Sequence, residues 1–286
     1  MITTHICCLF IAVGSAAVLT PDISTADDTL PQSRVAVATV FSKPIYADEL
    51  DVDPSRKPPS GLTDEQLSQW RIYQRDSRLS HLIWAPLVDQ YCLDHPCEPT
   101  DEEITAFNQS DERSKQQRVE GWRNRKTALT KALQSPDLTD ARRKEATEQL
   151  KQLDSLLATE EHMYDGMTPE QRAAVEASRP AREREIARVF IRNWKFNKAL
   201  YQQYGGRVIF QQAGMEPLDA YRAWLKEHES RGDFAINDAT LRDQFWSYFL
   251  SEAHNFVPIE EFRKESGLVD PWEKPWWLLP QKENTN

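Results

Sequence analysis

Apolar positions follow two different periods along the chain, and each period predicts its own kind of secondary structure. Over Val35–Phe41, apolar and smaller side chains alternate with the period of two that is typical of a half-buried strand. Ser42-Lys43-Pro44 then predicts a tight turn. We expect a small antiparallel element in which Val35–Phe41 pairs either with Lys43–Tyr46 or with Val208–Gln211.

Most of the remaining chain has the period of an amphipathic helix, and its helices have clear start signals. Three capping boxes, in which a threonine is followed three residues later by Gln or Glu, begin at Thr63, Thr100 and Thr168. Asn237-Asp238 is a further N-cap. Apolar faces rich in Leu, Ile, Tyr, Phe and Trp follow these signals. The predicted fold class is therefore mainly α, with the small antiparallel β element.

A long charged stretch, residues 108–165, interrupts this pattern. Asn108–Arg118 contains no apolar residue, Ser135-Pro136-Asp137 breaks the chain, and leucines resume at Leu150. Such a sequence predicts a solvent-exposed helical hairpin inserted in the helical module, the alternative being disorder at its tip. Its apolar stripe is too thin to predict a stable coiled coil on its own.

The first residues have the features of an export signal. Ile6–Leu19 is an apolar run of the length of a signal-peptide core, and Ser24-Thr25-Ala26 offers small residues where a signal peptidase cleaves. The run ends at Thr20-Pro21, short of the about 20 apolar residues that a membrane helix needs. No Lys or Arg precedes the run, so a misassigned start or a short tail is the alternative. We expect residues 1–26 to be removed and the mature protein to be periplasmic or otherwise exported.

Composition and charge narrow the classes of partner. The chain has 286 residues but only 9 glycines, a balance that favours helices over a β-sandwich or barrel. Because the formal net charge is -10, phosphate backbones and anionic lipid surfaces repel the chain, and we expect no nucleic-acid partner. After residue 26 no apolar run is long enough to cross a bilayer, so we expect no membrane span.

Two cysteines follow the predicted signal, Cys92 and Cys97, five positions apart. A helix end and a turn between them would bring their α-carbons within the roughly 6 Å that a disulfide requires. An exported protein matures in an oxidising compartment, so we predict a local disulfide, the alternative being two small buried thiols. These cysteines and His95 are too few ligands for a zinc site.

No pattern of residues indicates catalysis. The histidines are scattered, and the chain has no Gly-x-Ser-x-Gly, Walker or dinucleotide fingerprint, so we expect no catalytic residue, no metal and no cofactor. One face of the helix after Thr168 is basic, through Arg184, Arg188, Arg192 and Lys195. We interpret this basic stripe as a solvated, salt-bridged face, with an anionic ligand as the alternative.

The C-terminal segment, residues 269–286, concentrates aromatic side chains. Trp272, Trp276 and Trp277 lie within six residues and are separated by prolines, which prevent both a helix and a central strand. Exposure of three indole rings to water is unfavourable, so we expect the rings to be buried against other apolar side chains. We expect the segment to dock along the protein's own helices as a strap. In the alternative it binds a partner or covers a peptide-binding surface, which makes the three tryptophans candidate peptide- or partner-binding residues.

Two segments carry a resemblance to a known family. Residues 34–51, RVAVATVFSKPIYADELD, have a strand, a turn and a second short strand before an acidic helix entry. Residues 82–107, LIWAPLVDQYCLDHPCEPTDEEITAF, have an apolar helix, a loop, a Thr-Asp-Glu-Glu cap and the next helix. Together they resemble the N-terminal domain of the SurA family of periplasmic chaperones. The family's parvulin-type isomerase module has a histidine-rich strand and a Gly-Gly-Asp-Leu-Gly type loop, and neither occurs here.

The resemblance implies a chaperone-like module without isomerase activity, which binds unfolded or extended polypeptide without ATP. Outer-membrane proteins are candidate clients. The alternative is a structural or adaptor protein of the envelope, with one dedicated partner bound through the hairpin or the Trp segment. The predicted organisation is a signal peptide, a SurA-like segment, the charged hairpin, a helical region that completes the core, and the tail, with boundaries at 1–26, 27–107, 108–165, 166–268 and 269–286.

Overall fold

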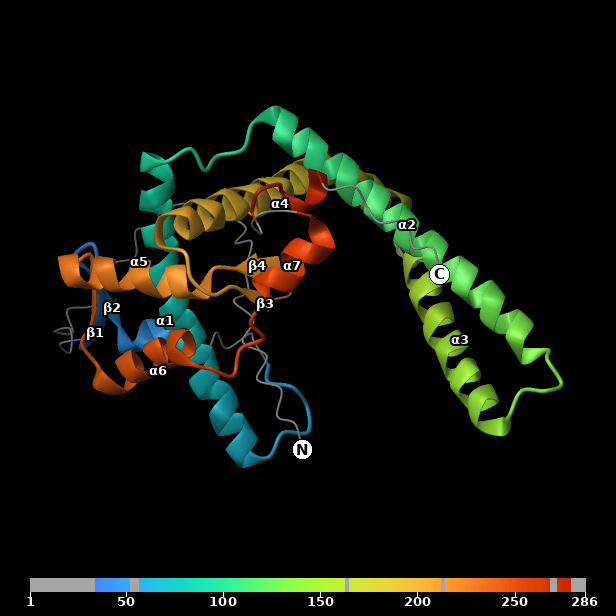
Figure 1. The fold of residues 1–286 in the computed structure, drawn as a ribbon. Coiled ribbons are helices and arrows are strands. Elements are labelled where there is room, and N and C mark those ends of the chain that lie inside the picture. The colour runs from blue at the N-terminus through green and yellow to red at the C-terminus, as the bar shows by residue number, and fades with distance from the viewer. Residues whose placement is uncertain (1–33, 52–56, 163–164, 212–213, 268–271, 279–286) are drawn as a thin grey trace. The chain divides into compact units, whose positions relative to one another are not determined.

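The computed structural model describes residues 34–51, 57–162, 165–211, 214–267 and 272–278. The described part is mainly helical with small antiparallel sheets, which confirms the predicted fold class (Figure 1). The predicted signal peptide lies outside the described residues. In chain order the elements are β1 (Ala36–Val40), β2 (Lys43–Tyr46), η1 (Ala47–Leu50), α1 (Asp64–Asp94), α2 (Asp101–Leu133), α3 (Asp140–Glu161), α4 (Pro169–Tyr204), β3 (Ile209–Gln211), β4 (Gly214–Glu216), α5 (Leu218–Arg231), β5 (Phe234–Ile236), α6 (Ala239–Leu250), α7 (Ile259–Ser266) and η2 (Trp276–Leu278).

The chain folds into two units. The first comprises residues 1–96 and 195–273, and the second comprises residues 97–194 and 274–286. The chain changes unit after Pro96, inside α4 after Trp194, and again after Glu273. One long helix, α4, therefore contributes to both units.

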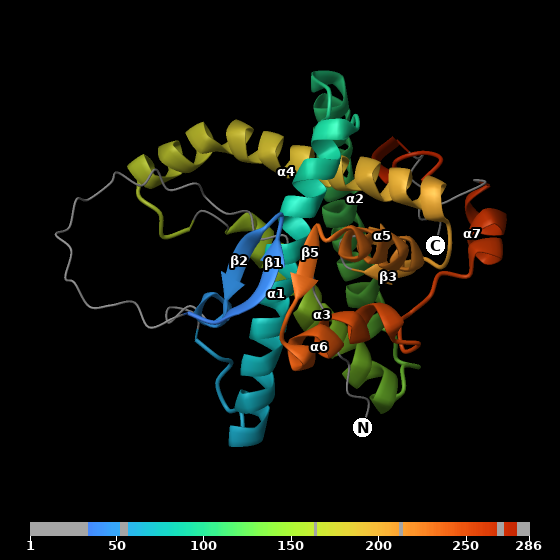
Figure 2. The same ribbon diagram turned by 90° about the vertical axis from the view of Figure 1, so that its left-hand side faces the viewer.

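β1 is the middle strand of a three-stranded antiparallel sheet in the first unit, with the order β2-β1-β5 (Figure 2). The predicted pairing of this strand with Lys43–Tyr46 is confirmed. The alternative partner is wrong, since β3 pairs with β4 in a hairpin of its own. The other neighbour of β1 is β5, which was not predicted because three residues between two helices carry too short an alternation to be recognised.

The turn between β1 and β2 lies one residue earlier than the sequence predicts. Val40 pairs with Lys43, so the loop consists of Phe41 and Ser42 alone. Both have positive φ, 46° and 64°, which matches a two-residue turn of type I′. Neither residue is the Gly or Asn that such a turn favours, and this explains why the sequence signal pointed to Pro44 instead.

The predicted helix starts are confirmed by their hydrogen bonds. At Thr63 the backbone amide donates to Gln66 Oε1 at 2.9 Å, and the Gln66 amide donates to the Thr63 hydroxyl at 3.2 Å. Thr100 and Thr168 form the same reciprocal boxes. At α6 the Leu241 amide donates to Asp238 Oδ1 at 3.0 Å. Local sequence therefore fixes where these helices begin.

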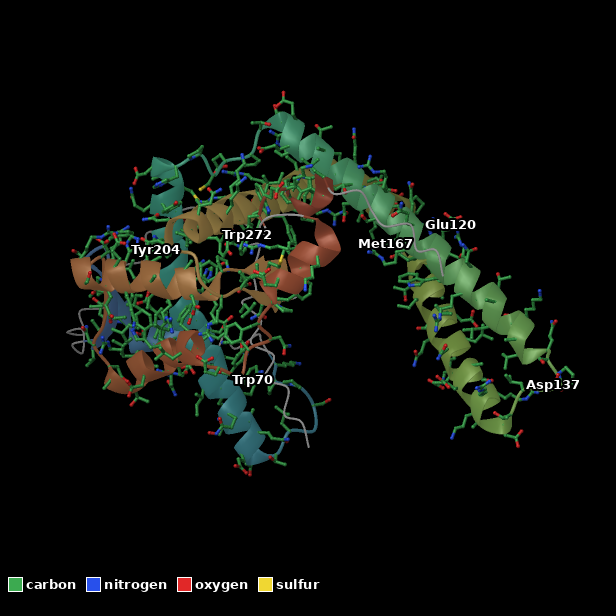
Figure 3. All side chains as sticks on the ribbon, viewed as in Figure 1. Trp70, Glu120, Asp137, Met167, Tyr204 and Trp272 are labelled. Carbon is green, nitrogen blue, oxygen red and sulfur yellow. The ribbon has the colours of Figure 1, made fainter. Side chains whose placement is uncertain are left out.

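In the second unit, α2 and α3 form the predicted charged hairpin and lie side by side (Figure 1). Asp137 marks the loop at its end (Figure 3). Leu153 and Leu157 are buried along the thin apolar seam. Ion pairs tie the two helices across the seam: Lys115 to Glu160 at 3.2 Å, Arg123 to Glu161 at 3.4 Å and Lys126 to Asp154 at 2.7 Å.

Candidate functional site

The tryptophans of the C-terminal segment are the candidate binding residues, and two of them are buried in the structure. Trp272, labelled in Figure 3, is 2% exposed and belongs to the first unit. Its ring lies 4.7 Å from the ring of Tyr201 on α4, measured between centroids. This tryptophan is a core residue of the first unit and is not presented to solvent.

Trp277 is buried in the second unit, at 3% exposure, by side chains from α2 and α4. Its ring centroid lies 5.4 Å from that of Phe107 and 5.6 Å from that of Trp194, with interplanar angles of 66° and 72°. These are edge-to-face contacts, the favoured geometry for aromatic pairs. We call the surrounding set the Trp277 seat, namely Ile104, Phe107, Ala187, Phe190, Ile191 and Trp194.

Trp276–Leu278 form a 3-10 turn within the described part of the segment. Trp276 begins η2, but its side chain lies outside the described residues. Leu278 closes the turn, its amide donating to the Pro275 carbonyl at 2.9 Å, and its side chain is 56% exposed. The segment thus has Trp272 buried in the first unit and Trp277 buried in the second, which favours the strap over an exposed binding tail.

The basic stripe of α4 forms ion pairs with residues at the start of α2. Arg184 donates to Asp101 at 2.6 Å, and Arg188 donates to Glu98 at 3.0 Å. Arg192 lies 3.4 Å from the other oxygen of Glu98. The salt-bridged interpretation therefore holds for these three arginines, and their partners Asp101 and Glu98 lie at the start of α2 and just before it. The pairs position the two walls of the Trp277 seat.

An aromatic cluster fills the first unit. Trp84 of α1 meets Phe196, Tyr221 and Trp224 edge-on, with centroid distances of 5.8, 4.8 and 5.4 Å. Phe196 and Trp224 are each 2% exposed, so these rings are core. The abundance of aromatic residues thus serves mainly the interior of the unit and does not by itself indicate a binding surface.

A set of hydrogen-bonded polar residues lies beside this cluster, around the β3–β4 hairpin. The Tyr221 hydroxyl donates to Asn197 Oδ1 at 2.6 Å, and Asn197 Nδ2 donates to the Met215 carbonyl at 3.3 Å. Burial raises the pKa of the neighbouring Glu216 carboxyl to about 7, and burial together with that carboxylate raises the pKa of Tyr221. Glu216 is the most perturbed acid among the described residues, a signal that sequence alone does not contain.

Among the described residues, His228 is the one buried histidine, and no sequence pattern distinguishes it from the others. His228 Nδ1 lies 2.8 Å from Asp233 Oδ2, and its ring meets Trp224 edge-on at 4.6 Å. Burial lowers the pKa of His228 in spite of the Asp233 carboxylate. The Asp233 amide also donates to the His228 carbonyl at 3.0 Å, so the pair closes the end of α5. We assign it a structural role.

The two predicted disulfide cysteines are buried, with exposed fractions of 7% for Cys92 and 2% for Cys97. The structure holds both as thiols, and the disulfide stays a prediction. In the part of the chain that the structure describes, no group of three or more His, Cys, Asp or Glu is placed to hold a metal ion. Over the same ranges, none of the helices combines the length and the apolar character that a membrane crossing requires.

No family model matches the chain, and neither a curated protein nor a solved structure matches it significantly. The similarity to the SurA N-terminal domain therefore rests on the two sequence segments alone and stays a prediction.

Proposed function

We propose that this protein binds unfolded or extended polypeptide without ATP and without catalysing a reaction on it. The observation that carries the proposal is the Trp277 seat. Two helices offer apolar and aromatic side chains that hold an irregular, proline-containing segment through one indole. An unfolded client presents the same features, since it has no regular structure and exposes isolated aromatic side chains. Recognition of this kind needs no defined client sequence.

Two sequence features support the same proposal. The predicted export signal would deliver the protein to a compartment where polypeptides arrive unfolded, and the resemblance to the SurA N-terminal domain points to chaperone-like binding. Clients would then be exported polypeptides, with outer-membrane proteins as candidates. The lack of the isomerase motifs is the reason to propose binding alone.

The test is the aggregation of a chemically unfolded, aromatic-rich protein after dilution into buffer without nucleotide, followed by light scattering. The protein should slow aggregation at equimolar ratio. Because apolar contacts are not screened by salt, protection should change little between about 50 and 500 mM salt. An inert acidic protein of similar net charge is the control, and it should give no protection.

One combination of results would overturn the proposal. It is the absence of protection at several-fold molar excess together with capture of one stoichiometric, folded partner after mild crosslinking in an envelope extract. That outcome would favour the adaptor function.

A further inference from the structure

We infer that the Trp277 seat is the surface that binds clients, and that the protein's own C-terminal turn, residues 275–278, competes with clients for it. This inference rests on the proposed function. Beyond the proposed function, the inference names the surface that binds clients and the client chemistry that this surface selects. It also says how the tail controls access of clients to the surface. The occupant we commit to is an extended segment that carries a tryptophan or phenylalanine.

The seat has connections of its own that do not involve the tail. Phe107 of α2 stacks on Phe190 of α4, with a centroid distance of 5.7 Å and an interplanar angle of 30°. Arg184 and Asp101 join the same two helices through a 2.6 Å ion pair. These contacts remain when the tail leaves, so the seat is expected to stay assembled and open to another occupant.

Among the described side chains of the tail, Trp277 is the one that lies deep in the seat. Trp277 is 3% exposed, whereas the next residue, Leu278, is 56% exposed. Lys274, directly before the turn, is also exposed. The turn is closed by its own hydrogen bond from the Leu278 amide to the Pro275 carbonyl. A ligand with one dominant anchor depends on that single side chain for most of its affinity.

The walls of the seat define what else fits. Phe107 and Trp194 both meet the indole in edge-to-face geometry, which another aromatic ring reproduces and an aliphatic side chain does not. Ile104, Ala187 and Ile191 line the rest of the seat with apolar atoms, which penalise an unpaired charge. The chemistry therefore selects isolated aromatic residues in extended chain.

Competition within one chain has a measurable consequence. While Trp277 occupies the seat, a client binds only the fraction of molecules whose tail has left, so its apparent Kd is the intrinsic Kd divided by that fraction. A tethered competitor acts at a high effective concentration, in the millimolar range for short tethers. Removal of the anchor should therefore tighten client binding without adding any contact.

The experiment uses the full-length protein and a fluorescein-labelled peptide of sequence EKPWWLLPQ, copied from residues 273–281. By fluorescence anisotropy, Trp277→Ala should bind this peptide at least about tenfold more tightly than the wild type. The matched control is Leu278→Ala, which changes the exposed neighbour in the same turn and should behave as wild type. A peptide with both tryptophans replaced by alanine should not bind.

Equal peptide affinity of wild type and a folded Trp277→Ala variant would overturn the inference and leave Trp277 as a core residue only. If Trp277→Ala unfolds, the wild-type chain labelled with 5-fluorotryptophan answers the question, with Trp277→Phe used to assign the signal. Saturating peptide should move the Trp277 fluorine signal towards that of solvent-exposed tryptophan. A signal that stays in place would contradict the inference.

The two proposals fail in distinguishable ways. Tight peptide binding by Trp277→Ala without protection of any unfolded client would retain the seat and its competitor but remove the chaperone function. Protection of clients that does not respond to Trp277→Ala would retain the chaperone function and place its surface elsewhere.

Discussion

The carboxylate of Asp219 accepts hydrogen bonds from both the backbone amide and the guanidinium of Arg207, each at 2.9 Å. Arg207 also donates to Glu252 at 2.6 Å and lies over the ring of Phe256, 4.2 Å from its centroid. Burial raises the pKa of Asp219, but the hydrogen bonds and charge of Arg207 outweigh it, so the pKa is lowered overall. Arg207 thereby connects the start of α5 with the segment that follows α6.

This arrangement requires a glycine before Arg207. Gly206 has a φ of 93°, and a β-carbon there would press into the Asp219 side chain. Gly206→Ala should lower the free energy of unfolding by more than about 2 kcal/mol, measured by urea denaturation. Gly205→Ala is the matched control, with positive φ but open space around it, and should lose only about 1 kcal/mol. Equal losses would show that the Asp219 contact does not matter.

The raised pKa of Glu216 predicts how the free energy of unfolding depends on pH. Its folded pKa of about 7 lies above its ordinary value of 4.5, so the folded state binds the proton more tightly than the unfolded state. Stability should therefore fall as the pH rises from 4.5 through 7, by up to about 3 kcal/mol, and then level off.

Glu216→Gln removes this dependence. The variant should be more stable than the wild type at pH 8, where the wild type carries the desolvated charge, and nearly equal to it at pH 4.5. Urea denaturation at the two pH values measures the difference. Tyr221 of α5 interacts electrostatically with Glu216, and its raised pKa keeps it neutral over this range. A variant that loses stability at both pH values would show that Glu216 is stabilising in its ionised form.

Trp272 should act as a structural anchor of the first unit. Trp272→Ala removes a 2% exposed indole that lies against Tyr201, and should lower the free energy of unfolding by about 3 kcal/mol or more. Leu250→Ala, at a 53% exposed position, is the control and should change stability by less than about 0.5 kcal/mol. Unchanged hydrogen exchange in the first unit of Trp272→Ala would contradict the anchor role.

Cys92 and Cys97 should be bridged in protein that is expressed with export into an oxidising periplasm. Mass spectrometry of the non-reduced peptide should show the loss of two hydrogens. Because both side chains are buried, alkylation must be done in denaturant, and neither cysteine should react before reduction. Cys97→Ser provides the reference in which Cys92 reacts without reductant. Alkylation of both cysteines in unreduced wild-type protein would refute the disulfide.

Features that depend on neighbours along the chain could be predicted from the amino-acid sequence. Capping boxes fixed the starts of α1 and α2, because both partners lie within four residues of each other. The long polar run predicted the α2–α3 hairpin in the same way. The functional conclusion drawn from the sequence, a chaperone-like module, stays a proposal, since it came from a resemblance and not from a pattern of reactive residues.

Features that depend on residues far apart in the chain became visible only in the packed fold. β1 pairs with β5 as its second neighbour, although β5 lies almost 200 positions later in the sequence. No local pattern encodes this pairing. The burial that raises the pKa of the Glu216 carboxyl likewise comes from tertiary packing. Trp272 and Trp277 look alike in sequence, but they are buried in different units, against Tyr201 and Phe107 respectively. From the local sequence one can predict that an indole ring will be buried, because its exposure to water is unfavourable. Which side chains bury it depends on the tertiary packing.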